Sequence, residues 1–142
     1  MIVVDASAAI SALLNAGPAR RALGESQLHV PHLIDAEVAN GLRRMVAAGE
    51  IDEGVGWAAL DTWRQLGLIR YPVFSFLDRV WQLRDNVSAY DACYVALAEN
   101  LGSTLVTADA RISRIPLLRC AVTVVPRCPR AARGAVSQEA SR

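Results

Sequence analysis

The chain has 142 residues, of which 53% are hydrophobic and 20% are charged, and its formal net charge is +1. This length fits one domain with a substantial core, and the composition excludes a disordered or fibrous chain. The near-neutral charge excludes a nucleic-acid binder that relies on overall basicity, so any contact with RNA or DNA would need a local arginine patch.

Short β-branched runs alternate with helix-like segments along the chain. Strands are predicted at 2–4, 28–30, 68–71, 104–107 and 122–125. Helices are predicted at 7–15, 19–23, 33–48, 51–66, 75–85 and 109–113, and another is capped by Ser88 and ends near Gly102. Strands separated by helices predict an α/β fold with a mostly parallel sheet of about five strands and helices on both faces. The domain is placed at 1–129, and residues 130–142 are predicted to be a flexible Arg- and Ala-rich tail.

The cysteine pattern and the start of the chain bear on its location. Three cysteines, at positions 93, 120 and 128, have no CxxC spacing, so neither a disulfide framework nor a zinc site is expected. The first apolar run leads straight into Asp5 without a basic leader, and the stretch after it is too short to span a membrane. We therefore expect a cytoplasmic protein with no membrane contact.

Asp91 is the only charged residue within the apolar, helix-like run from 87 to 98. A helix that is apolar on every side is usually buried, and an ionised carboxylate there is costly unless it is paired or bound to a metal. The chain contains no lysine. A cation from solution is thus the simplest partner for Asp91.

Other acids are expected near Asp91. Asp5 follows the first predicted strand and Asp109 follows the fourth, and ligands of parallel sheets collect at the carboxyl ends of strands. Glu37 lies near the start of the helix after the second strand. Four clustered carboxylates repel one another, and a hard cation such as Mg²⁺ relieves that repulsion. Such a site polarises a phosphodiester and activates a water for in-line attack.

The four acids belong to four motifs in residues 1–126: Asp5 after a hydrophobic strand, the Pro-x5-Glu-x2-Asn pattern of Pro31, Glu37 and Asn40, Tyr90-Asp91-Ala92 in an apolar helix, and Thr107-Ala108-Asp109 after a strand. In order and spacing, this set resembles the PIN-domain nucleases and, more narrowly, the VapC toxins. The resemblance implies a PIN-like three-layer α/β/α sandwich and an endoribonuclease that depends on Mg²⁺ or Mn²⁺.

The resemblance also implies roles for individual residues and partners. Asp5, Glu37 and Asp91 would be the main metal ligands, and Asp109 would complete the catalytic acids as a further metal-binding residue. The supporting residues would be Ser7, Asn40 and Thr107. A VapB-type antitoxin whose C-terminal segment covers the acidic groove, an RNA substrate and a homodimer are implied as partners. One departure is Arg111, where some relatives carry a second acid, which predicts weak binding of any second metal.

Structural roles compete with these assignments for several residues. Asp5 and Asp109 each fit a helix cap. The two histidines, His29 and His32, have no matching ligand cluster and are expected at the surface. Trp57, Trp63 and Trp81 are expected to pack in the core or in a dimer interface rather than to stack on bases. Arg84 is a candidate rim contact for substrate phosphate.

Other enzyme classes fit the sequence less well. A receiver domain, as a family, relies on a lysine that this chain lacks, and a haloacid-dehalogenase-like phosphatase would need an acid where Ser7 stands. A P-loop nucleotidase is excluded by the absence of a Gly-Lys-Ser/Thr element. The remaining alternative is a catalytically weak PIN-like module that binds RNA or an antitoxin.

Overall fold

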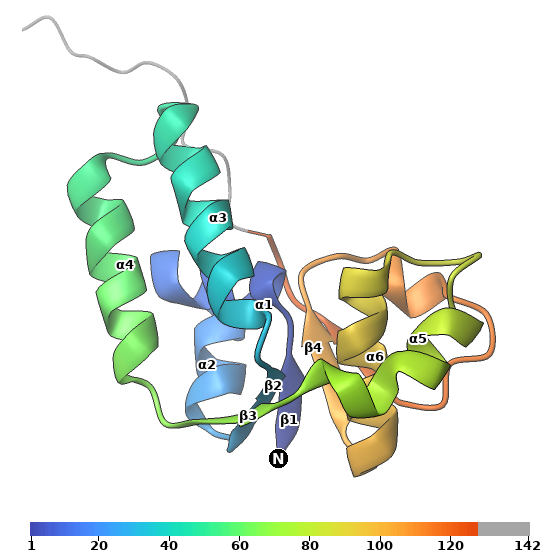
Figure 1. Ribbon diagram of the computed structural model, residues 1–142. Helices are drawn as coiled ribbons and strands as arrows, with labels where there is room; N and C mark the ends of the chain where they lie inside the picture. The colour runs from blue at the N-terminus through green and yellow to red at the C-terminus, as the bar shows by residue number, and fades with distance from the viewer. Residues whose placement is uncertain (128–142) are drawn as a thin grey trace, which may run out of the picture.

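A computed structural model describes residues 1–127 of the chain. Five parallel strands form one sheet in the order β3-β2-β1-β4-β5 (Figure 1). The strands are β1 Ile2–Val4, β2 Leu28–Pro31, β3 Leu68–Tyr71, β4 Thr104–Thr107 and β5 Val122–Val124. The predicted α/β class and parallel sheet are confirmed. The predicted domain end at 129 and the predicted tail at 130–142 lie outside the described residues.

Helices connect the strands. Within residues 1–127 the α-helices are α1 Ala6–Leu14, α2 Pro18–Gly24, α3 Ile34–Ala47, α4 Glu53–Gln65, α5 Leu77–Gln82 and α6 Ala89–Leu101. Two 3-10 helices are η1 Val73–Phe76 and η2 Ile112–Arg114. No helix in this part of the chain is long and apolar enough to cross a membrane.

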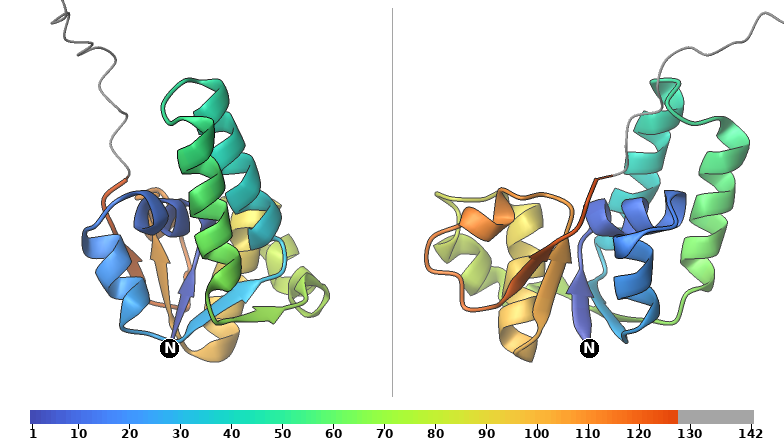
Figure 2. Two further views of the ribbon diagram at one scale, coloured as in Figure 1. Left: turned by 90° about the vertical axis from the view of Figure 1, so that its left-hand side faces the viewer. Right: turned by 180° about the vertical axis from the view of Figure 1, so that it is seen from behind.

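The strand order explains why helices cover both faces of the sheet. The chain moves outward from β1 to β2 and β3, then crosses back to β4 and β5. Because parallel connections are right-handed, the reversal places α1 to α4 on one face and α5 and α6 on the other. Figure 1 shows α5 and α6 on one side, and the view from behind in Figure 2 shows α1 and α2 on the opposite side. The result is a three-layer sandwich.

Helix α6 forms the centre of one layer. Its residues 92–98 are all buried, and it contacts β1, β2 and β4. The Ser88 side chain caps its start by accepting the Asp91 N–H at 3.2 Å, as predicted. Gly102 ends it with a φ of +60°, a conformation that glycine adopts without steric cost.

Two helices differ from their predicted extents. The predicted helix at 75–85 begins as the 3-10 turn η1 and ends at Gln82. Leu83 turns into the core, and the next amides bond three residues back, Arg84 N–H to Trp81 O and Asn86 N–H to Leu83 O. This turn leaves room for Ser88 to begin α6. The predicted helix at 109–113 is only the 3-10 turn η2, because Asp109 bonds its own loop.

Candidate active site

The candidate site begins where β1 and β4 end side by side. These strands are parallel neighbours, so Asp5 and Thr107 leave the sheet at the same edge. The Asp5 N–H donates to Val106 O at 3.1 Å, which fixes the backbone of the first acid to β4. Sheet geometry therefore brings together two motifs that are about 100 residues apart.

Asp5 is held by three donors. Its Oδ1 accepts from the Ser7 hydroxyl at 2.7 Å and from the Ala8 N–H at 2.9 Å, and its Oδ2 accepts from the Thr107 hydroxyl at 2.5 Å. Asp5 is thus the N-cap of α1 and also lines the groove described below. The capping role and the site position are both present.

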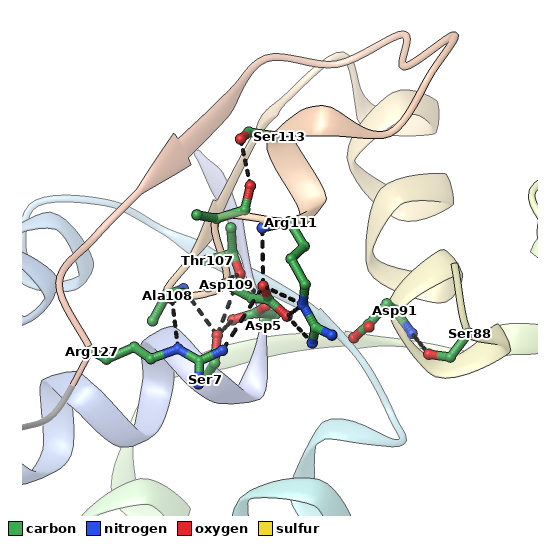
Figure 3. A network of polar contacts seen from close by, with 11 residues as sticks. Asp5, Ser7, Ser88, Asp91, Thr107, Ala108, Asp109, Arg111, Ser113 and Arg127 are labelled. Carbon is green, nitrogen blue, oxygen red and sulfur yellow. Dashed lines mark hydrogen bonds and ion pairs between the residues drawn. The ribbon is translucent and has the colours of Figure 1, made fainter. Parts of the chain in front are cut away.

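Ser7 and Thr107 also join Asp5 to the loop after β4. The Ser7 hydroxyl oxygen accepts the Ala108 N–H at 2.9 Å, and the Thr107 hydroxyl oxygen accepts the Asp109 N–H at 3.0 Å. Each hydroxyl therefore donates to Asp5 while it accepts from the loop (Figure 3). The two predicted supporting residues are placed beside the first acid.

Glu37 reaches the groove from the first turn of α3. Its Oε1 accepts a hydrogen bond from the buried Tyr94 hydroxyl at 2.5 Å. Tyr94 follows Asp91 by three residues on α6, so both lie on one face of that helix. We did not single out Tyr94 from the sequence, although this spacing was a usable signal.

Asp91 lies in the first turn of α6 and is half-buried, less enclosed than its apolar neighbours suggested. The helix N-terminus offers a carboxylate favourable partial charge, which compensates part of the desolvation that the sequence argument assigned to a cation. Asp91 still lines the groove. Its environment is a groove wall rather than a sealed core.

Asp109 differs from the other three acids because arginine already pairs with it. Both carboxylate oxygens contact Arg111, and the shortest distance is 2.7 Å from Arg111 Nη2 to Asp109 Oδ2. Arg127 Nη2 lies 3.9 Å from Asp109 Oδ1. The sequence identified Arg111 only as a departure from the family pattern and did not predict this pair.

The four predicted acids line one groove of about 600 Å³, which Glu50 lines as well. Two arginines line it as well, and the remaining wall includes apolar side chains from α1 and α3: Arg44, Arg127, Ile10 and Met45. Figure 3 shows Asp5 and Asp109 close together, with Asp91 across from them. The predicted convergence of Asp5, Glu37, Asp91 and Asp109 is therefore seen.

The pKa shifts separate Asp109 from the rest. Burial raises the pKa of Asp5, Glu37 and Asp91, and neighbouring carboxylates raise each of them further. The hydrogen bonds from Arg111 instead lower the pKa of Asp109. Asp109 therefore has its own counter-ion, whereas burial is the main influence on the pKa of the other three acids.

The donor set suits a hydrated hard cation. The four predicted acids offer oxygen ligands, and the mutual repulsion among Asp5, Glu37 and Asp91 is what a divalent ion would relieve. Within residues 1–127, no three acidic, histidine or cysteine side chains form a closed cluster that could hold an ion. Mg²⁺ usually keeps several waters and binds through one or two carboxylates, so an open arrangement fits it better than a cage.

Two predicted site residues lie outside the groove. Asn40 is exposed on α3, where its Oδ1 accepts from Arg43 Nε at 3.0 Å. Arg84 lies over the Trp81 ring, 4.7 Å from its centroid. Neither belongs to the groove lining.

Two expectations about aromatic and histidine residues are corrected. His29 is buried in β2, where its Nδ1 lies 2.6 Å from the Tyr71 hydroxyl, whereas His32 is exposed. Trp63 is in the core as predicted, and its Nε1 donates to Asp35. Trp57 and Trp81 are 59% and 68% exposed, so neither is in the core, and packing in a dimer interface stays a prediction for them.

Residues 2–118 match the PIN domain family, and the chain belongs to that family. It is 54% identical over 127 residues to ribonuclease VapC9 of Mycobacterium tuberculosis, and the matched region covers 89% of this chain and all of the relative. It is 44% identical over 128 residues to ribonuclease VapC1 of the same organism, covering 87% of this chain and 96% of the relative.

Solved structures support the fold. PAE2754 from Pyrobaculum aerophilum has a TM-score of 0.64 at 22% identity, covering 85% of this chain and 82% of the other. The M. tuberculosis toxin VapC20, described as cleaving the sarcin-ricin loop, has a TM-score of 0.62 at 18% identity, covering 85% and 99%. VapBC2 from Rickettsia felis has a TM-score of 0.60 at 16% identity, covering 87% and 98%. The PIN-like three-layer fold is confirmed.

Proposed function

We propose that the chain is a divalent-metal-dependent endoribonuclease that acts as the toxin of a toxin–antitoxin pair. The observation that carries the proposal is the convergence of Asp5, Glu37, Asp91 and Asp109 on one groove at the carboxyl edge of the sheet. The VapC ribonucleases that cover nearly the whole chain support the same activity.

The chain's own residues would hold the reacting groups. Mg²⁺ or Mn²⁺ held by Asp5, Glu37 and Asp91 would polarise the scissile phosphodiester and activate a water for in-line attack. Three hydrogen bonds, from the Ser7 hydroxyl, the Thr107 hydroxyl and the Ala8 N–H, fix the Asp5 carboxylate in place. Tyr94 fixes Glu37 by donating to Oε1, so Oε2 stays available to the groove.

RNA cleavage by purified protein, with and without Mg²⁺ or Mn²⁺, tests this function. The native chain should produce discrete new RNA ends only with metal, and Asp91→Asn should produce none while keeping its fold. Asp85→Asn is the matched control, because Asp85 is an exposed aspartate outside the groove. Cleavage that survives in Asp91→Asn would contradict the mechanism.

The alternative is a catalytically weak PIN-like module that binds RNA or an antitoxin. That module would bind RNA or its partner without creating new ends, and binding would survive Asp91→Asn. The presence of all four acids in one groove favours the enzyme. The same cleavage assay, combined with an RNA-binding measurement, separates the two functions.

The proposed partner is a VapB-type antitoxin that covers the acidic groove, and the proposed setting is the cytoplasm. The solved complex of VapBC2 is a structural neighbour of this chain. Cys93 and Cys120 are free thiols within the described residues, as expected in a reducing compartment. Co-purification of the chain with the product of an adjacent small gene would test the partner.

We also propose a homodimer, formed through an apolar stripe on η1 and α5 that consists of Phe74, Leu77 and Trp81. These residues follow i, i+3, i+7 spacing and are 82%, 51% and 68% exposed. The opposite face of the same segment is buried through Phe76, Val80 and Leu83. A segment that is apolar on both faces needs a second partner surface.

The charges beside the stripe favour a second copy over RNA. Asp78 lies between Leu77 and Trp81 and Arg84 follows the stripe, so the segment lacks the basic excess that phosphate contact needs. Two copies related by a two-fold axis present the same patch to each other. Antiparallel pairing of the two stripes would set Arg84 of one copy near Asp78 of the other.

A further inference from the structure

Arg111 is anchored to Asp109 more completely than an ordinary surface arginine. Asp109 Oδ1 accepts hydrogen bonds from the Arg111 backbone N–H and from Arg111 Nε, both at 3.0 Å. Asp109 Oδ2 accepts from Arg111 Nε at 3.2 Å and from Arg111 Nη2 at 2.7 Å. A carboxylate has about four acceptor sites. Each oxygen of Asp109 therefore already receives two contacts from one residue.

The environment of the pair makes it asymmetric. The Asp109 side chain is 13% exposed at the groove, whereas the Arg111 side chain is 81% exposed. The backbone of Asp109 is also held in place, because its N–H donates to the Thr107 hydroxyl that binds Asp5. The arginine is thus the removable member of the pair, and the carboxylate is the preorganised one.

The guanidinium also affects the neighbouring acid. Arg111 interacts electrostatically with Asp91 as well as with Asp109, and Figure 3 shows its guanidinium between these two carboxylates. A positive charge in this position repels an incoming divalent ion and satisfies the carboxylate that the ion would use. Arg111 therefore places a positive charge beside two of the carboxylates that line the groove.

We propose that Arg111 competes with the divalent metal inside the chain itself. Arg111 occupies the Asp109 carboxylate and so restricts metal binding to Asp5, Glu37 and Asp91. This inference rests on the proposed function of the groove and deepens it. Asp109 then acts by holding Arg111, and metal affinity is set below what four free acids would provide. Removal of the arginine converts Asp109 into an additional metal ligand.

Mn²⁺ binding to the purified full chain, measured by calorimetry, tests the inference without an activity assay. Arg111→Ala should bind Mn²⁺ roughly twofold to fivefold more tightly than the native chain, the effect of removing one largely exposed charge. The double variant Asp109→Asn with Arg111→Ala should lose that gain, because the freed carboxylate is its source. Circular dichroism checks that each variant is folded.

Arg127→Ala is the matched control for charge alone. Arg127 lines the same groove and approaches Asp109 only at 3.9 Å, so its removal deletes one positive charge without freeing the carboxylate. A gain in Arg127→Ala as large as that in Arg111→Ala would overturn the inference, and so would an unchanged affinity in Arg111→Ala. A native chain that binds no Mn²⁺ would overturn the proposed function together with this inference.

Discussion

Hydrogen bonds orient several acids in the groove, and Glu37 is the clearest case of one acid oriented by one donor, the Tyr94 hydroxyl. Tyr94 donates to Glu37 Oε1, and its ring is 1% exposed. Partners that orient a metal ligand typically contribute tenfold to hundredfold in metal affinity or activity. Such a residue acts on the site while it remains part of the core.

Tyr94→Phe should therefore weaken function more than stability. We expect a loss of roughly tenfold or more in Mn²⁺ affinity or in cleavage rate. The free energy of unfolding should fall by only about 1 kcal/mol, because one hydrogen bond is lost and Glu37 can bind water instead. Metal titration and urea unfolding of the same variant measure both effects. A large loss of stability with unchanged metal affinity would contradict the orienting role.

The raised pKa of Asp91 makes a prediction about stability and pH. Burial raises this pKa, so ionised Asp91 destabilises the metal-free fold at neutral pH. Asp91→Asn should therefore raise the free energy of unfolding at pH 7. The gain should shrink as the pH falls toward the unfolded pKa of about 3.9, because the native carboxyl is then neutral too. Urea titrations from pH 7 to pH 4 in chelator measure this difference.

Added Mg²⁺ should reverse the stability difference between the native chain and Asp91→Asn. The native chain should gain stability with metal concentration, since the ion binds the folded state alone, and Asp91→Asn should gain much less. If Asp91→Asn is less stable than the native chain in chelator at pH 7, the carboxylate contributes structurally and the repulsion argument is wrong.

At the scale of elements, one buried ion pair holds α5 to α6 and to the loop before β5. Arg79 Nε lies 2.7 Å from Glu99 Oε2, and Arg79 Nη2 also donates to Leu117 O. Burial alone would raise the pKa of Glu99, but its bonds to Arg79 and to the Arg119 N–H leave it lowered. This pair positions α6 and hence Asp91.

Arg79→Met should cost about 2–3 kcal/mol of unfolding free energy, because it leaves a nearly buried carboxylate without its partner. Arg64→Met is the control, since its pair with Asp61 is exposed and should contribute about 0.5 kcal/mol or less. Because the pKa of Glu99 is lowered in the folded state, ionised Glu99 contributes to stability above its unfolded pKa. This contribution is lost as the pH falls through the folded pKa of Glu99. Equal losses in the two variants would contradict this assignment.

Element positions were largely predictable, whereas exact helix ends were not. The strand at 104–107 and the Ser88 cap follow from local sequence, and both are observed. The helix predicted at 75–85 ends earlier, at Gln82, because Leu83 turns into the core, which is a tertiary effect. The exposure of Trp81 escaped prediction for the same reason, since spacing identifies an apolar face but not what covers it.

In the candidate site, the positions of the acids were predictable, whereas their partners were not. The order of the motifs and the parallel sheet were sufficient to predict that Asp5 and Asp109 share an edge. The pairing of Asp109 with Arg111 was not predictable, because two residues in one loop can face each other or face apart. Asn40 matched a spacing pattern but lies on the exposed side of α3. Sequence spacing thus located the carboxylates better than it located their partners.

At the scale of the whole molecule, the apolar stripe of Phe74, Leu77 and Trp81 predicts the assembly. Light scattering should give a dimer for the native chain, and Trp81→Glu should give a monomer, since a buried charge opposes association. Trp57→Glu is the control, because Trp57 is similarly exposed but lies on α4. A native monomer, or a dimer that Trp81→Glu leaves intact, would contradict this interface.

The position of the metal is the most direct test of the central claim. Anomalous scattering from a crystal of the native chain grown with Mn²⁺ would locate the ion in the groove. We predict one ion held by Asp5, Glu37 and Asp91, partly through bound waters, with Arg111 still paired to Asp109. An active, Mn²⁺-loaded protein with its ion elsewhere than this groove would contradict the account.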